Sequence, residues 1–159
     1  AGSRVMVIGN IQRMLSHSTP SHMIDSKPFI AELISEVRSA LPDPDKLVIT
    51  VQADSAMLTS TKATALGALL LEAVNNALKH AFPDGMSGTL AVSFVVSNGK
   101  YTIELKDDGV GIEQTQTHWG FGTQNVADLT RLMGGSITRD PACLSKTRPG
   151  TSWRLVIPA

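Results

Sequence analysis

Cysteine is almost absent from this sequence, since Cys143 is the only one among 159 residues. A single thiol cannot close an internal disulfide, which is typical of a reducing compartment. We therefore expect a cytoplasmic domain, whether or not its parent protein is attached to a membrane. Cys143 follows an Asp-Pro-Ala turn with no histidine nearby, so a catalytic thiol is not indicated. There is no apolar run of about 18 residues, and we expect no membrane contact by this part of the chain.

Aromatic residues and net charge are also scarce. Aromatic residues make up 4% of the chain against 42% hydrophobic residues, so the core must be built mainly from aliphatic side chains. Fourteen basic residues balance fourteen acidic ones. Such a chain has no overall field to attract nucleic acid, and we expect no nucleic-acid partner. An anionic ligand has to be held locally, by backbone amides, a metal ion or a few cations.

Hydrophobic periodicity predicts both helices and strands along the chain. The expected helices span residues 4–16, 26–41, 61–80 and 123–133, and the expected strands span residues 47–51, 89–96, 101–106, 136–139 and 152–157. Strand hairpins mixed with helices predict an α+β fold. We expect a two-layer sandwich, in which helices pack on one face of a mixed, mostly antiparallel sheet.

Local signals place several boundaries. Ser26 is a plausible N-cap for the second helix, with Pro28 tolerated in its first turn. The Asn98-Gly99 pair predicts a tight turn between two strands. The residues before Ser26 open in mid-pattern, without a clear helix start or a signal peptide. We therefore expect a piece of a longer protein.

The long helix carries a polar stripe that includes Glu72 and Asn76, four residues apart and so on one face. Lys79 and His80 extend that face by one turn. A solvent-exposed face with an i,i+4 contact is one interpretation. The other is a ligand site, because a carboxylate and an amide oxygen are hard ligands suited to Mg²⁺.

Two glycine-rich segments follow later in the chain. Asp107 stands at the end of a predicted strand and begins Asp-Asp-Gly-Val-Gly, in which Gly109 and Gly111 permit close backbone approach to a flat ligand. The carboxylate can accept a hydrogen bond from an exocyclic amine. Gly120-Phe121-Gly122 then precedes a predicted helix, whose free amides suit a phosphate. Each pattern alone also fits an ordinary glycine-rich loop.

Taken in order, these segments resemble the motifs of the GHKL superfamily, which includes gyrase, Hsp90, histidine kinases and MutL. Residues 72–80 resemble its N box, residues 107–111 its G1 box, residues 120–123 its G2 box, and Gly150-Thr151 its closing Gly-Thr pair. The resemblance covers roughly residues 45–159. It implies the Bergerat fold, a two-layer α/β sandwich, with ATP and Mg²⁺ as cofactors.

The resemblance also implies roles for individual residues. Asn76 would coordinate Mg²⁺, and Glu72 would hold a water on the metal, although its role is the least defined. Asp107 would bind the adenine amino group, with help from Gly111 and Thr151. The implied nucleotide-binding set is Asn76, Lys79, His80, Asp107, Gly109, Gly111, Ile112, Gly120, Phe121, Gly122 and Thr151, with Glu72, Asn76 and Lys79 as the catalytic group. Residues 113–119 would form the lid over ATP.

Within the superfamily, the first 41 residues resemble the end of the dimerisation and phosphotransfer region of short-lid histidine kinases, related to the HWE group. We therefore expect residues 1–41 to be a remnant of that region and residues 42–159 to be the ATP-binding domain. His17, His22 and His118 do not match the phosphoacceptor context. The resemblance thus implies an incomplete histidine kinase, whose partners are a phosphoacceptor helix outside this sequence, a response regulator and a second copy in the full-length protein.

Three alternatives stay open. A protein serine kinase of the anti-sigma type shares the motifs but lacks dimerisation helices. A degenerate scaffold would keep the fold without binding nucleotide, although the intact Asn76 and Asp107 count against it. An ATP-hydrolysing clamp would use Glu72 as a general base, although the small size of the chain counts against it.

Overall fold

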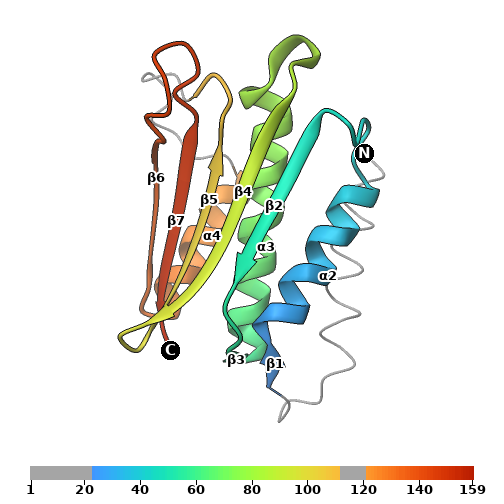
Figure 1. The fold of residues 1–159 in the computed structure, drawn as a ribbon. Coiled ribbons are helices and arrows are strands. Elements are labelled where there is room, and N and C mark those ends of the chain that lie inside the picture. The colour runs from blue at the N-terminus through green and yellow to red at the C-terminus, as the bar shows by residue number, and fades with distance from the viewer. Residues whose placement is uncertain (1–22, 112–120) are drawn as a thin grey trace.

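The computed structural model describes residues 23–111 and 121–159. They form a five-stranded sheet in the order β2-β4-β5-β7-β6, with helices packed against one of its faces (Figure 1). β2 and β4 run parallel, and every other neighbouring pair is antiparallel. The predicted α+β fold with a mixed, mostly antiparallel sheet is confirmed.

The predicted strands are present, and so are the helices predicted after residue 25, with shifts at their ends. The bounds are β1 Ile24–Asp25, α2 Ser26–Ser39, β2 Leu47–Ala53, β3 Met57–Leu58, α3 Ser60–Asn76, the π-helical turn η1 Ala77–Ala81, the 3-10 turn η2 Pro83–Gly85, β4 Gly88–Ser97, β5 Lys100–Asp107, α4 Phe121–Leu132, β6 Ser136–Pro141 and β7 Thr151–Pro158. The turn between β4 and β5 has positive φ at both Asn98 and Gly99, as a tight hairpin turn requires. The predicted helix 4–16 lies outside the described residues.

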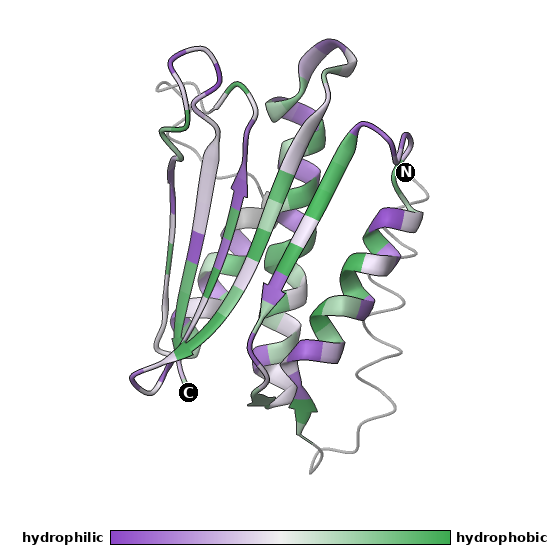
Figure 2. Cartoon of the chain, in the orientation of Figure 1, coloured by the Kyte–Doolittle hydropathy of each residue, from purple (hydrophilic) through white to green (hydrophobic). Residues whose placement is uncertain are grey.

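The sheet buries one face and leaves the other open. Along β5, Tyr101, Ile103 and Leu105 are buried while Thr102 and Glu104 between them are not, because successive side chains in a strand point to opposite faces. Figure 2 shows hydrophobic residues both on the strands and on the helices that cover them. Asp107 follows the same alternation, and this places a carboxylate on the covered face at the end of β5.

The start of α2 differs from the prediction. Asp25, not Ser26, is the N-cap, and its side chain accepts a hydrogen bond from the Lys27 amide at 3.0 Å. Ser26 is fully buried because its hydroxyl donates to the Asp54 carbonyl at 2.7 Å and accepts from the Ala56 amide at 2.9 Å. These contacts accompany a two-stranded sheet of β1 and β3, which is too short to produce a sequence pattern.

The core is continuous across the predicted boundary at residue 41. Six buried residues of the α2 segment belong to the same hydrophobic cluster as α3 and the sheet: Phe29, Ile30, Leu33, Ile34, Val37 and Leu41. Arg38 of α2 also donates to the Ile49 carbonyl on edge strand β2. Residues 26–41 therefore fold together with the sheet, and any dimerisation role for the segment 1–41 stays a prediction.

The predicted long helix 61–80 is wrong in its last turn. The α-helix ends at Asn76, and Ala77–Ala81 forms a π-helical turn. Its hydrogen bonds span five residues instead of four. Lys79 and His80 therefore do not continue the α-helical face of Glu72 and Asn76 in register. Across residues 23–111 and 121–159, none of the helices is long and apolar enough to span a bilayer.

Candidate functional site

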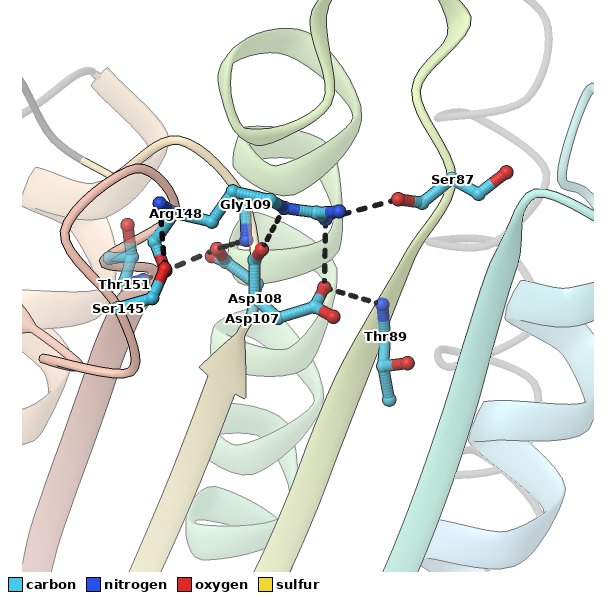
Figure 3. A network of polar contacts seen from close by, with 8 residues as sticks. All are labelled: Ser87, Thr89, Asp107, Asp108, Gly109, Ser145, Arg148 and Thr151. Atoms are coloured by element: carbon cyan, nitrogen blue, oxygen red, sulfur yellow. Dashed lines mark hydrogen bonds and ion pairs between the residues drawn. The ribbon is translucent and has the colours of Figure 1, made fainter.

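Asp107 lies where the ends of β5 and β7 meet. The residue is 4% exposed, and Oδ1 accepts two backbone hydrogen bonds, from the Gly109 amide at 3.0 Å and from the Thr151 amide at 3.2 Å (Figure 3). The second bond follows from register, because Asp107 pairs with Thr151 in the antiparallel ladder. The structure thus brings together the predicted G1 motif and the predicted closing Gly-Thr pair.

The environment of this carboxylate is electrostatically unfavourable. Burial raises the pKa of Asp107 above its usual range, and the negative charge of Asp108 raises it further. The hydrogen bonds from Gly109 and Thr151 and the charge of Arg148 oppose the rise without cancelling it. A buried carboxylate with a raised pKa at the end of a strand is typical of a functional site.

The second oxygen of Asp107, Oδ2, accepts no hydrogen bond within the described residues. None of the fully buried polar side-chain atoms in the described parts of the chain lacks a partner. Oδ2 is therefore accessible. A hydrogen-bond donor of a ligand can approach it while Oδ1 stays bonded to the backbone.

Glycines allow the Asp107 loop to pack tightly against its neighbours. A Cβ on Gly109 would lie 2.3 Å from the Ala81 carbonyl oxygen, and the Val110 amide donates to that oxygen at 2.9 Å. The loop is thus joined to the π-helical turn that follows Asn76. A Cβ on Gly150 would lie 2.1 Å from the Asp107 carbonyl oxygen. Both glycines are required by contacts inside the protein, and the predicted contact of Gly109 with a ligand stays a prediction.

Glu72 and Asn76 lie half-buried near the end of α3. The Asn76 side-chain nitrogen donates to Glu72 Oε1 at 3.4 Å, as the predicted i,i+4 spacing requires. This contact orients the amide so that its oxygen is turned away from Glu72. In the ranges that the structure describes there is no cluster of three or more His, Cys, Asp or Glu side chains suited to a metal. A metal here would need most of its ligands from water or from a bound molecule.

Lys79 and His80 are exposed on η1. Neither forms an ion pair with another described residue. The charge of Lys79 and the hydrogen-bonding groups of both side chains therefore remain available to an anionic ligand. Because the G1 loop bonds to Ala81 at the end of η1, this cationic segment adjoins the Asp107 loop.

Several predicted site residues follow Gly111 in the chain. Ile112, Gly120 and the expected lid 113–119 lie outside the described residues. α4 begins at Phe121, two residues earlier than predicted, so Gly120 directly precedes the helix. The side chain of Phe121 is also outside what the structure describes. Gly111 has a φ of 85°, and a Cβ there would lie 2.7 Å from Pro149.

Arg148 belongs to the network around Asp107, although no sequence pattern indicates it. Its guanidinium binds the Asp108 carbonyl, the Asp108 carboxylate and the Ser87 carbonyl at 2.7 Å, 3.3 Å and 3.0 Å (Figure 3). The residue lies in the polar loop before Gly150. In such a loop the sequence does not distinguish an arginine that binds several partners from one that is exposed to solvent.

The sequence of residues 61–159 matches the family of histidine kinase-, DNA gyrase B- and HSP90-like ATPases. The match covers more than half of the chain, so the chain belongs to this family and carries an ATP-binding domain of that type.

Individual relatives agree with this membership. A blue-light-activated histidine kinase of Erythrobacter litoralis is 32% identical over 108 residues, which are 65% of this chain and 29% of the relative. The chain thus spans less than a third of that protein's length. The structure of a histidine kinase domain from an Erythrobacter litoralis blue-light-activated kinase is 25% identical, with a TM-score of 0.74 over 98% of this chain and 78% of the other. A mycobacterial sensor histidine kinase, 22% identical with a TM-score of 0.65 over 86% of this chain and 96% of the other, shares the fold.

Proposed function

We propose that this chain is the ATP-binding catalytic domain of a sensor histidine kinase, which transfers the γ-phosphate of ATP to a histidine outside the given sequence. The observation that carries the proposal is the buried Asp107 carboxylate, held by two backbone amides with Oδ2 accessible. The histidine kinases among the relatives favour this branch of the family.

In this proposal Asp107 recognises the base. Oδ2 accepts a hydrogen bond from the exocyclic amine of adenine, and a base with a carbonyl at that position is disfavoured because two acceptors would face each other. Thr151, whose amide bonds to Asp107, and Gly111, which packs against Pro149 and Gly150, contribute directly or through water. The aliphatic core residues Ala77 and Val126, both buried, would form the apolar wall of the adenine site on its helix side.

Asn76 is proposed as the protein ligand of Mg²⁺, through its amide oxygen. The residues present fit this ion, because Mg²⁺ takes oxygen ligands, keeps several waters and needs few protein groups when it also binds phosphates. Bound there, the ion would neutralise charge on the phosphates. Glu72 orients the amide through the observed contact and can hold a metal-bound water.

Lys79 and His80 are proposed to contact phosphate oxygens from η1. The start of α4 adds backbone amides from Gly120, Phe121 and Gly122, and a helix N-terminus attracts anions. Phosphoryl transfer depends mainly on positioning and charge neutralisation. These residues would hold the transferred group in line with the acceptor histidine, which the phosphoacceptor helix supplies.

The proposed partners are that helix, a response regulator and a second copy of the full-length chain. The direct test mixes this chain with a separately produced phosphoacceptor helix of its parent protein and γ-labelled ATP. Acid-labile label on the helix is expected. Acid-stable label on a serine would instead identify the anti-sigma type of kinase.

Binding is tested separately by calorimetry. The wild type is expected to bind ADP with Mg²⁺ in the micromolar to millimolar range, and Asp107→Asn to bind it much more weakly. Unchanged affinity in the variant would remove the adenine assignment. Absence of binding by the wild type would leave only a degenerate scaffold.

A further inference from the structure

Arg148 joins three segments that meet beside Asp107. From the loop before β7, its Nε donates to the Asp108 carbonyl at 2.7 Å, and one terminal nitrogen donates to the Ser87 carbonyl at 3.0 Å and to Asp108 Oδ1 at 3.3 Å. The same carboxylate oxygen accepts from the Thr89 amide at 2.7 Å. Figure 3 shows the guanidinium spanning the gap between the strand carrying Thr89 and the loop carrying Asp108.

The loop that presents Arg148 is itself folded. The Ser145 hydroxyl accepts from the Arg148 amide at 2.9 Å and donates to the Arg148 carbonyl at 3.1 Å. The Leu144 amide donates to the Pro149 carbonyl at 3.1 Å. The position of the guanidinium is therefore set by its own loop and by the groups it binds.

These contacts restrain Asp107 from two directions. Asp108, its neighbour in sequence, is bound by Arg148 through both carbonyl and carboxylate. Gly150, two residues after Arg148, donates its amide to the Gly109 carbonyl at 3.0 Å and packs directly on the Asp107 carbonyl. A shift of Arg148 would therefore move the backbone on either side of the buried carboxylate.

The Arg148 guanidinium also lies over the ring of Phe82, in the segment that follows η1. Its carbon lies 6.0 Å from the centre of the Phe82 ring. Phe82 comes directly after η1, and its ring occupies the space where a Cβ on Gly88 would lie, at 2.0 Å. Arg148 thus contacts both the loop that follows Asp107 and the residue that follows the turn carrying Lys79 and His80.

We propose that Arg148 is a positioning residue for base selection, which holds Asp107 through Asp108 and Gly150. The proposal rests on the proposed function, because it assumes that Asp107 binds the adenine amine. An ion pair exposed by 36% and 42% on its two sides contributes little to stability by itself. A planar guanidinium that bonds two backbone carbonyls restrains geometry instead. The expected effect of its loss is therefore on selection between bases more than on folding.

The test compares ADP with inosine diphosphate, which carries a carbonyl in place of the adenine amine. In Arg148→Ala we expect the Kd for ADP to rise about tenfold, which corresponds to one hydrogen bond to a charged group, while the Kd for inosine diphosphate changes less than about twofold. Hydrogen exchange at the Gly109 and Thr151 amides should become faster in the variant without any nucleotide, because Asp107 accepts from both.

Arg154→Ala is the matched control. Arg154 pairs with Glu104 at 3.2 Å on the open face of the sheet, so its loss should change neither Kd. Arg148→Lys keeps the charge without the planar guanidinium and serves as the second variant if Arg148→Ala does not fold. It should also lower the ratio of the Kd for inosine diphosphate to the Kd for ADP.

The outcomes are distinguishable. A ratio of the two Kd values that stays unchanged in both Arg148 variants, whether or not both Kd values rise, would overturn the positioning role alone. A wild type that binds ADP no better than inosine diphosphate would overturn the assignment of Asp107 and, with it, this inference. A lower Tm with unchanged binding would reduce Arg148 to a structural residue.

Discussion

The Thr151 amide donates a hydrogen bond to Asp107 Oδ1 at 3.2 Å, although 44 residues separate the two in sequence. This bond joins the predicted G1 motif to the predicted closing Gly-Thr pair, which the register of β5 and β7 brings side by side. It uses the carboxylate oxygen to which the Gly109 amide also donates. Oδ1 therefore stabilises the fold, whereas Oδ2 accepts no hydrogen bond from the described residues and is the atom proposed to bind a ligand.

The first prediction concerns pH. Binding of the adenine amine needs an ionised Asp107, and the pKa of this carboxyl is raised by burial. ADP affinity should therefore fall as pH decreases through that raised pKa. Folding stability should change in the opposite direction, because the folded protein takes up this proton more readily than the unfolded chain does and so gains stability as pH falls through the window between the two pKa values.

Asp107→Asn is the reference protein for the pH dependence of both ADP affinity and folding stability. Calorimetric titration with ADP at several pH values should show a larger acid-induced loss of affinity in the wild type than in the variant, since protonation of the phosphates affects both proteins equally and only the wild type also protonates Asp107. At neutral pH the variant should bind about 10- to 100-fold more weakly, as expected for loss of a hydrogen bond to a charged acceptor. Identical pH profiles for the two proteins would contradict the assignment.

The second prediction concerns Gly109→Ala. The new Cβ would lie 2.3 Å from the Ala81 carbonyl oxygen and 2.5 Å from its Cβ, so the loop or the π-helical turn has to move. We expect a loss of about 1–3 kcal/mol in the free energy of unfolding and a weaker ADP affinity, because the displaced loop carries Asp107.

Gly99→Ala is the control for this substitution. A Cβ at Gly99 meets nothing within 4 Å, although its φ of 70° imposes backbone strain. Denaturant unfolding should show a loss of about 1 kcal/mol, and ADP affinity should stay unchanged. Equal effects of the two variants on ADP binding would show that the contact with Ala81 does not position the loop.

Much of the fold could be predicted because its signals are local and repeated. The alternation along β5 predicts both the strand and the position of Asp107 at its end. The π-helical turn could not be predicted, since Ala77–Ala81 continues an apolar helical pattern and its hydrogen bonding depends on the loop packed against Ala81. The same applies to Arg148, whose partners come from segments that only the folded chain brings together.

The third prediction concerns α2, which lies on the other side of the expected domain boundary at residue 41. Leu33 is 1% exposed in the core shared with α3 and the sheet. Leu33→Ala should lower the free energy of unfolding of the whole domain by about 2–5 kcal/mol in one cooperative transition. The exposed neighbour substitution Glu32→Ala should change it by less than about 0.5 kcal/mol. Unfolding of α2 in a separate transition would instead support a boundary at residue 41.

The last prediction concerns the proposed metal ligand. If Asn76 binds Mg²⁺ through its amide oxygen, Mg²⁺ should increase ADP affinity in the wild type and have little effect in Asn76→Ala. Glu72→Ala tests orientation separately, because it removes the acceptor 3.4 Å from the Asn76 nitrogen but keeps the amide oxygen. We expect Glu72→Ala to weaken the Mg²⁺ effect a few-fold without abolishing it.

The exposed substitution Asp128→Ala on α4 removes a carboxylate without touching α3 and should leave the Mg²⁺ effect intact. Calorimetry with ADP, with and without Mg²⁺, gives the ratio of affinities for each protein. An equal ratio in the wild type and Asn76→Ala would exclude Asn76 as the ligand. Complete loss in Glu72→Ala would instead make Glu72 a direct ligand, because loss of orientation alone leaves the amide oxygen able to bind.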